Sequence, residues 1–320
     1  MFRKFSLTLF LAVTISSSIL ISGCKDSTAP NGKKPAKQKM LIYTSIQPIA
    51  FITSKIAGRY ADVKALIPQG KSPHSFALVA KDLSAMSKAS FFFSIRLPFE
   101  ELKLRKAFKG AKTQWVNIAE GVKFLPAQPV ECGHEACKAA KAKSVDVTQV
   151  DPHIWLNPEN DLIMARNICN TLSKAMPQHA KYFELNFQTF TRSLITLDKK
   201  LEKMLAPYKG EVFLVYHPAF AYFADRYGLK QEAVELGGKT PSPKHLQEVI
   251  KLAKKKKVKI IFVQPEFNRK AAKVIAKSIK GSVIKLDPLA YKLIDNYIYF
   301  GTKIQSAMKY REGGSRANEK

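Results

Sequence analysis

The chain has 320 residues, and 53 Lys and Arg against 25 Asp and Glu give it a formal net charge of +28. This length is enough for two modest domains with hydrophobic cores. Beyond the N-terminus no apolar run is long enough to cross a hydrocarbon core of about 30 Å, which excludes a protein with several membrane spans.

The N-terminus has the pattern of an export signal. An Arg-Lys pair precedes an apolar run from Phe5 to Ile21 that only Ser and Thr interrupt, and the run ends in Ile-Ser-Gly-Cys. This order is typical of a lipobox, in which the thiol of Cys24 is lipidated and becomes the new N-terminus. We expect a lipoprotein signal peptide over residues 1–23. A cleaved signal without lipid and a single membrane helix are the alternatives.

Residues 24–39 are rich in Lys, Pro, Ser and Gly and contain almost nothing apolar. Such a segment cannot bury enough surface to offset its ordering entropy, so it is expected to be a flexible tether. The protein is then exported and held in the periplasm or at the outer face of the cell membrane through the Cys24 lipid.

The positive charge raises the question of nucleic-acid binding, because basic proteins release counterions when they bind phosphates. An exported protein meets no cytoplasmic nucleic acid, and the lysines are scattered along predicted helices. The densest run, Lys254–Lys257, leads directly into a predicted strand and is interpreted as a solvated helix end. We therefore expect no nucleic-acid partner, and attraction to anionic lipid headgroups is the favoured use of the charge.

From residue 40 onward, short β-rich runs alternate with helical patterns. The predicted strands form two sets of four: Met40–Thr44, Val63–Ile67, Phe91–Ile95 and Gln114–Ile118, then Val212–Tyr216, Gln231–Glu235, Val258–Val263 and Ser282–Leu286. Helical patterns fill most of the gaps, at residues 48–59, 80–88, 98–109, 219–228, 242–257 and 268–280. This alternation predicts an α/β fold in which parallel sheets are covered by helices.

A long apolar seam separates the two sets of strands. Apolar positions step by four and three along it: Phe183, Phe187, Phe190, Leu194, Leu197, Leu201 and Met204. The seam predicts one helix of about 28 residues, or about 42 Å, bounded by Pro177 and Pro207. A coiled-coil dimer is the alternative, but the seam has only about four heptads and few charged flanking positions. We expect a monomer.

The domain organisation follows from these elements. We expect an N-terminal lobe over residues 40–177, a linking helix over 178–205 and a C-terminal lobe over 206–310, with a disordered tail over 311–320. Each lobe would contain a parallel sheet of about four strands flanked by helices, and the one long helix would join the lobes as their backbone.

The cysteines other than Cys24 have two different settings. Cys169 lies on the apolar stripe of a helix and is interpreted as an inert core thiol. Cys132 and Cys137 lie close together in the segment from Glu120 to Val150, which has no clear periodicity. Outside the cytoplasm this pair could form a small loop disulfide.

Four candidate metal ligands lie next to prolines in turn-rich segments. His74 follows the strand that ends at Ile67, His217 and Asp287 each follow a strand directly, and His153 lies between two prolines. Ligands bind at the carboxyl ends of strands in parallel sheets. Imidazoles suit borderline metals such as zinc, and three of them with one carboxylate complete a tetrahedral shell. The residues alone predict a metal cleft and leave its ligand set open.

Motifs spread along the chain resemble those of a known family. They are Ile67-Pro68 with Pro73-His74-Ser75-Phe76, Phe93-Ser94-Ile95 with Pro98-Phe99-Glu100, Asp151-Pro-His-Ile-Trp-Leu-Asn-Pro158, His217-Pro-Ala-Phe-Ala-Tyr-Phe223 with Tyr227-Gly228-Leu229, Pro241-Ser-Pro243 and Asp287-Pro-Leu289. From Ile42 to Met308 the chain resembles the metal-binding solute receptors of bacterial ABC importers, in particular the zinc-uptake members.

The resemblance implies that His74, His153, His217 and Asp287 are the metal ligands, in a cleft between two lobes. It also implies capture of a metal outside the cytoplasm and delivery to an integral-membrane permease. Manganese-type relatives use a carboxylate at the position of His217. A third imidazole favours Zn²⁺, with Mn²⁺ or Fe²⁺ as the alternative cargo.

The chain departs from the family pattern in two places. Zinc-uptake members often carry a long histidine-rich loop, where this chain has only His134 with Cys132 and Cys137. A loop disulfide, a weak auxiliary metal site that includes His134, and neither of these are the open interpretations. His217 is also followed by Pro218, where many relatives have Asp.

Two other classes of function compete with the receptor. A zinc hydrolase also uses three protein ligands, but it leaves a position open for water, and the chain contains no His-Glu-x-x-His motif. A basic surface could also serve cell adhesion by binding acidic polymers. We expect a receptor without enzymatic activity.

Overall fold

A computed structural model describes the protein over residues 39–108, 110–127, 146–235, 241–267 and 269–316. The predictions for the signal peptide, Cys24, most of the tether, Cys132, His134 and Cys137 lie outside these residues. Among the helices in these ranges, none is long and apolar enough to cross a membrane.

The first sheet is parallel, and its strand order is β2-β1-β3-β4. Its strands are β1 (Met40–Thr44), β2 (Ala61–Ala65), β3 (Phe91–Ser94) and β4 (Gln114–Asn117). The helices between them include α1 (Gln47–Ala57), α2 (Ala80–Met86) and α3 (Arg105–Ala107). Ile42 of β1 pairs with Val63 on one side and Phe91 on the other. Every residue of β3 is buried, as expected for a strand that helices cover on both faces.

The second sheet repeats this topology with the order β6-β5-β7-β8, again parallel. Its strands are β5 (Val212–Val215), β6 (Lys230–Ala233), β7 (Ile260–Val263) and β8 (Ser282–Lys285). The helices between them are α6 (Ala221–Tyr227), α7 (Pro243–Lys255) and α8 (Lys270–Ser278). In such an order the crossovers change direction between β5 and β7, and parallel sheets bind ligands at the carboxyl ends of strands at this point.

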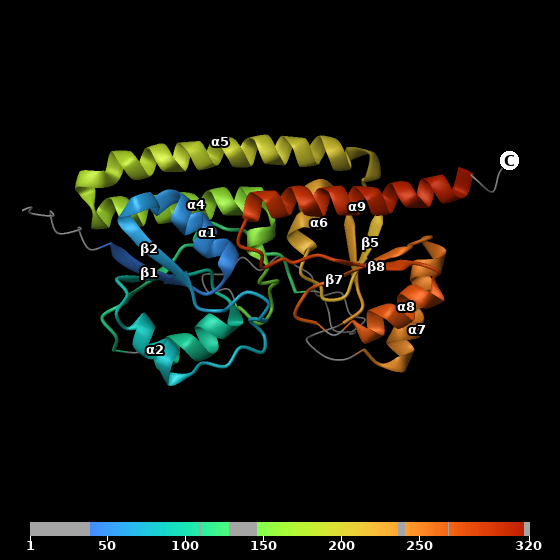
Figure 1. Cartoon of the computed structure of the whole chain (residues 1–320), viewed down its shortest axis with the longest axis horizontal. Helices are drawn as coiled ribbons and strands as arrows, with labels where there is room; N and C mark the ends of the chain where they lie inside the picture. The colour runs from blue at the N-terminus through green and yellow to red at the C-terminus, as the bar shows by residue number, and fades with distance from the viewer. Residues whose placement is uncertain (1–38, 109, 128–145, 236–240, 268, 317–320) are drawn as a thin grey trace, which may run out of the picture. The chain divides into compact units, whose positions relative to one another are not determined.

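Three long helices join the two sheets (Figure 1): α4 (Pro158–Ala175), α5 (Ala180–Leu205) and α9 (Leu293–Arg316). The helix α5 packs against both α4 and α9. Six of the seven positions of its predicted apolar seam are buried, and Met204, the last, is half-buried beside the buried Leu205. The approach of α9 is close, because a Cβ atom added to Gly301 would lie 2.4 Å from a methyl carbon of Leu201. The predicted two-lobe α/β fold with one long backbone helix is confirmed.

The structure corrects the sequence-based prediction at the C-terminus. The expected disordered tail over residues 311–320 is wrong for 311–316, which continue α9. The helix α9 was also absent from the predicted helices, although a helical stripe of buried residues marks its first part: Leu293, Tyr297, Phe300, Ile304 and Met308. This stripe packs into the core that the first sheet and α5 share, so α9 belongs to the layer that joins the two sheets.

The predicted helix over residues 98–109 is also interrupted. A π-helical turn at Glu100–Leu104 precedes the short α3. The buried Glu100 carboxylate accepts hydrogen bonds from the amides of Ile95 and Leu97, 3.0 Å each, and from the Ser94 hydroxyl, 2.7 Å. These contacts fold the chain back onto the end of β3, so the segment does not form one straight helix.

A buried polar contact holds α9 to α4. The Tyr297 hydroxyl donates to the Trp155 carbonyl, 2.9 Å, and lies 2.8 Å from Asp161 Oδ2. Burial raises the pKa of Asp161 well above its ordinary value, against the opposite effect of the Tyr297 hydrogen bond. The phenol has one proton, so we infer that a protonated Asp161 donates to the tyrosine oxygen while the hydroxyl donates to Trp155.

Replacing Asp161 with Asn tests this contact. The unfolded carboxyl titrates near its ordinary pKa of about 3.9, whereas the folded carboxyl keeps its proton to higher pH. The folded state then binds more protons than the unfolded state above about pH 4, so the free energy of unfolding falls as pH rises. We expect Asp161→Asn, whose amide can donate in place of the acid, to gain stability relative to the wild type between about pH 4 and pH 7.5.

Urea unfolding across this pH range measures the difference. Asp295→Asn, which changes an exposed carboxylate in the first turn of α9, is the matched control. A constant stability difference between Asp161→Asn and the wild type at every pH would contradict the buried, protonated assignment.

Candidate metal centre

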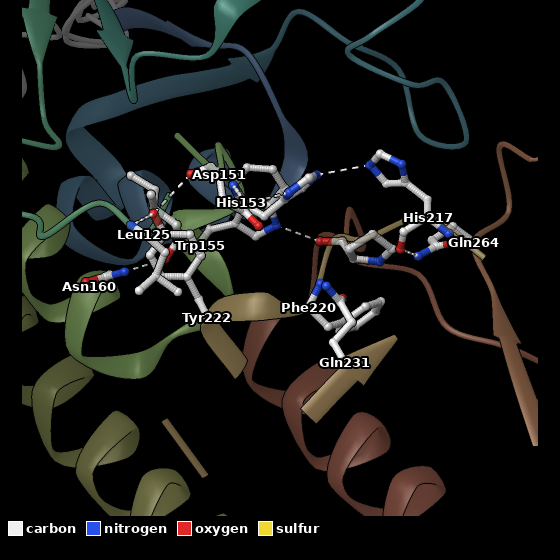
Figure 2. A network of polar contacts seen from close by, with 12 residues as sticks. Leu125, Asp151, His153, Trp155, Asn160, His217, Phe220, Tyr222, Gln231 and Gln264 are labelled. Carbon is white, nitrogen blue, oxygen red and sulfur yellow. Dashed lines mark hydrogen bonds and ion pairs between the residues drawn. The ribbon is translucent and has the colours of Figure 1, made fainter. Parts of the chain in front are cut away.

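Three histidines from different parts of the chain meet at the carboxyl ends of the two sheets. One ring nitrogen from each of His74, His153 and His217 lies within 4.8 Å of the others. The Nε2 atoms of His153 and His217 are 3.3 Å apart, and Figure 2 shows these two imidazoles pointing toward one another. The His74 ring centroid lies 4.9 Å from that of His217 and 5.9 Å from that of His153.

Hydrogen bonds fix His217 at the end of β5. Its backbone N–H donates to Gln264 Oε1, 3.1 Å, and its carbonyl accepts from Gln264 Nε2, 2.7 Å (Figure 2). Its ring stacks on Phe267 with a centroid separation of 4.8 Å. The Nδ1 atom lies 2.6 Å from Glu235 Oε2, and both side chains are buried. A carboxylate accepts only, so the proton belongs on Nδ1 and the Nε2 lone pair faces the other histidines.

His153 is held in the same way. Asp151 Oδ1 accepts from the His153 backbone N–H and lies 2.8 Å from its Nδ1 atom. The residue immediately precedes the 3₁₀ turn Ile154–Leu156, which leads into α4. The Trp155 indole donates to the Pro288 carbonyl, 2.8 Å, and so ties this loop to the one after β8. His153 therefore presents Nε2 to the centre, and its ring orientation is set by its neighbours in both lobes.

The electrostatic setting favours neutral imidazoles. Burial, followed by the nearby His153 and His217, lowers the pKa of His74. Burial also lowers the pKa of His217, against the opposing effect of its hydrogen bond to Glu235. His74 is the most solvent-exposed of the three, so water screens these effects most strongly there. Neutral imidazole is the form that binds a metal.

The two facing Nε2 atoms need a proton or a cation between them. With Nδ1 protonated on both rings, two lone pairs meet at 3.3 Å, an arrangement that a shared proton or a cation between them stabilises. The third imidazole lies at the same point. This set of nitrogen donors suits a borderline divalent metal such as zinc.

A cavity of about 230 Å³ adjoins the histidines, and His74, His153 and His217 all line it. Glu266, Pro288 and Leu289 also line it. Asp287, which was predicted as the fourth ligand, is not in the group of ligand atoms within 4.8 Å of one another. Its Oδ1 accepts a hydrogen bond from the Leu289 N–H, 2.9 Å. The structure brings the three histidines together and leaves Asp287 outside them.

Two carboxylates at the site were missed in the sequence. Glu235 is the last residue of the predicted strand that overlaps β6, and Glu266 follows β7 by three residues. The rule that selected His217 and Asp287, a position just after a parallel strand, applies equally to both. Burial raises the pKa of Glu266 to about 7, with nearby Asp287 adding to the effect. His179, which stacks on Tyr60, and His245 are half-buried and lie outside the three-histidine group.

The chain is similar in sequence and fold to proteins described as zinc-binding. The chain is 29% identical to the zinc-binding protein AdcA of Streptococcus pyogenes serotype M3 over 264 residues, 79% of this chain and 51% of that one. It is 26% identical to the high-affinity zinc uptake system protein ZnuA of Bacillus subtilis, over 90% of both chains. A crystal structure of ZnuA superposes with a TM-score of 0.76 at 30% identity, covering 84% of this chain and 99% of that one.

The chain spans about half the length of AdcA but nearly the full length of the Bacillus subtilis ZnuA. The family model described as the periplasmic component A of the zinc-uptake complex, ZnuA, matches residues 42–309. The chain therefore belongs to the ZnuA family.

Proposed function

We propose that this protein captures Zn²⁺ outside the cytoplasm and delivers it to the permease of an ABC importer. The observation that carries the proposal is the meeting of three imidazoles, two of them with Nε2 atoms 3.3 Å apart. A bound cation satisfies these facing lone pairs. Family membership and the zinc-binding descriptions of the relatives support the same cargo.

The donor set favours zinc over the alternative cargoes. In the part of the chain that the structure describes, the group of converging ligand atoms contains three imidazole nitrogens and no carboxylate oxygen. Imidazole suits zinc, whereas manganese favours oxygen donors. Mn²⁺ and Fe²⁺ remain the weaker candidates because divalent sites are not selective by affinity alone.

Attachment to the cell surface completes the proposal. The lipobox at Cys24 would hold the protein at the membrane, and the tether would let the lobes reach the permease. The net charge of +28 would attract anionic headgroups and keep the receptor near the bilayer. The receptor acts as a monomer without catalytic activity.

Competitive zinc titration of the metal-free protein tests the binding site. We expect one high-affinity zinc ion in the wild type. His153→Ala removes a nitrogen donor and should weaken binding by more than about 100-fold, beyond the 10- to 100-fold cost of losing a residue that only supports a ligand. His179→Ala, outside the three-histidine group, is the control and should bind as the wild type does. Unchanged affinity in His153→Ala would refute the site.

Glu235→Gln tests how His217 is oriented. The glutamine amide can donate to Nδ1, which would move the imidazole proton to Nε2 and block the metal-binding nitrogen. We expect zinc affinity to fall by about 10- to 100-fold while the urea midpoint changes little. Glu232→Gln, three residues earlier on β6 and half-buried, is the matched control. Equal zinc affinity in Glu235→Gln and Glu232→Gln would show that the hydrogen bond does not position the ligand.

A further inference from the structure

We propose that Glu266 supplies the fourth ligand of the metal and completes a shell of three imidazoles and one carboxylate. The inference rests on the proposed zinc-binding function and names a residue for the position that the three histidines leave unfilled. Zinc sites in proteins are most often four-coordinate, so a site held from three sides calls for one further donor.

The topology places Glu266 beside His217. The strands β5 and β7 are neighbours at the centre of the second sheet, and their carboxyl ends carry His217 and the segment 264–267. Gln264, at the start of this segment, exchanges two hydrogen bonds with the His217 backbone, and Phe267, at its end, stacks on the His217 ring. Glu266 thus lies between two residues that both contact a proposed metal ligand.

The roles of Gln264 and Glu266 are chemically distinct. Gln264 is 1% exposed and uses its amide both to donate and to accept, which a carboxylate cannot do. Glu266 lines the cavity together with all three histidines. Its Oε2 atom is shielded from solvent and has no hydrogen-bond partner among the described residues.

An unpartnered carboxylate oxygen is costly to bury. Removing a polar group from water without a hydrogen bond costs on the order of 1–3 kcal/mol, and more for a charge. Within the ranges that the structure describes, no Lys, Arg or His forms an ion pair with Glu266, although Lys103 lines the same cavity. A divalent cation at the three histidines would provide the missing partner.

Asp287 is less well placed for the same role. It follows β8, the edge strand of the sheet, and one of its oxygens already accepts the Leu289 N–H. Its neighbours Pro288 and Leu289 line the cavity, whereas Asp287 does not. Neither carboxylate is in the 4.8 Å group, but Glu266 has three side-chain torsions with which to approach it, one more than Asp287. Gln264 and Phe267 can keep their contacts with His217 during this change.

Zinc competition titrations of the full chain compare Glu266→Gln with Asp287→Asn. We expect Glu266→Gln to weaken zinc binding by about 100-fold, at least the upper end of the cost of losing a supporting residue. Asp287→Asn should weaken it much less. Glu202→Gln, on the exposed side of α5, should bind as the wild type does. Urea unfolding of the metal-free variants checks that the Glu266→Gln protein is folded.

Co²⁺ bound in place of zinc distinguishes a ligand from a nearby charge. Its d–d absorption depends on the number and geometry of the donors. Glu266→Gln should change this spectrum, and Glu266→Asp should restore part of the affinity. Lower affinity with an unchanged Co²⁺ spectrum would overturn the proposal, as would a larger loss in Asp287→Asn. Failure of the wild type to bind zinc would instead refute the proposed function itself.

Discussion

The close approach of the His153 and His217 Nε2 atoms, 3.3 Å apart, is the contact on which the architecture of the site depends. One ring comes from the loop that leads into α4 and the other from the end of β5. Asp151 and Glu235 accept from the Nδ1 atoms of these rings, so moving either imidazole proton to Nε2 would break a buried hydrogen bond. Two nitrogen lone pairs that face each other repel and so destabilise the metal-free protein, and a bound metal ion would replace this repulsion with coordination bonds.

Contacts elsewhere in the fold hold the segments that carry these two histidines in fixed positions. The helix α5 packs on α4 and α9, the Trp155 indole reaches the Pro288 carbonyl, and Tyr297 joins α9 to the Trp155 carbonyl. The last two connections both involve Trp155, two residues from His153. Several buried contacts would have to break together for a wide hinge motion, so release of the metal is expected to involve local movement of the ligand loops. The exposed loop that carries His74 is the part best suited to such movement.

The general architecture could be predicted from the sequence because each local pattern agreed with the fold. All eight strands were predicted within two residues at either end, and the seam of α5 was identified from its period. The C-terminal helix α9 was not predicted although Tyr297, Phe300 and Ile304 repeat at helical spacing, and its end at residues 311–316 was interpreted as part of a disordered tail. Glu100 interrupts a predicted helix through hydrogen bonds to residues that precede it, and no helical periodicity encodes such contacts.

The site was only partly predictable for a physical reason. Adjacent prolines or strand ends identified the three histidines as candidates, but Glu235, Glu266 and Asp287 also follow strands. Which of these carboxylates lies beside His217 depends on the pairing of β5 with β6 and β7, and that pairing is not visible in the sequence. Asp287 was carried over from a family resemblance, whereas the structure places Glu266 on the cavity wall.

X-ray absorption at the zinc edge of the loaded protein tests the central claim most directly. The account predicts nitrogen and oxygen donors at about 2.0–2.2 Å, with the multiple-scattering pattern of three imidazoles. Fewer than three imidazoles, or sulfur donors at about 2.3 Å, would contradict it.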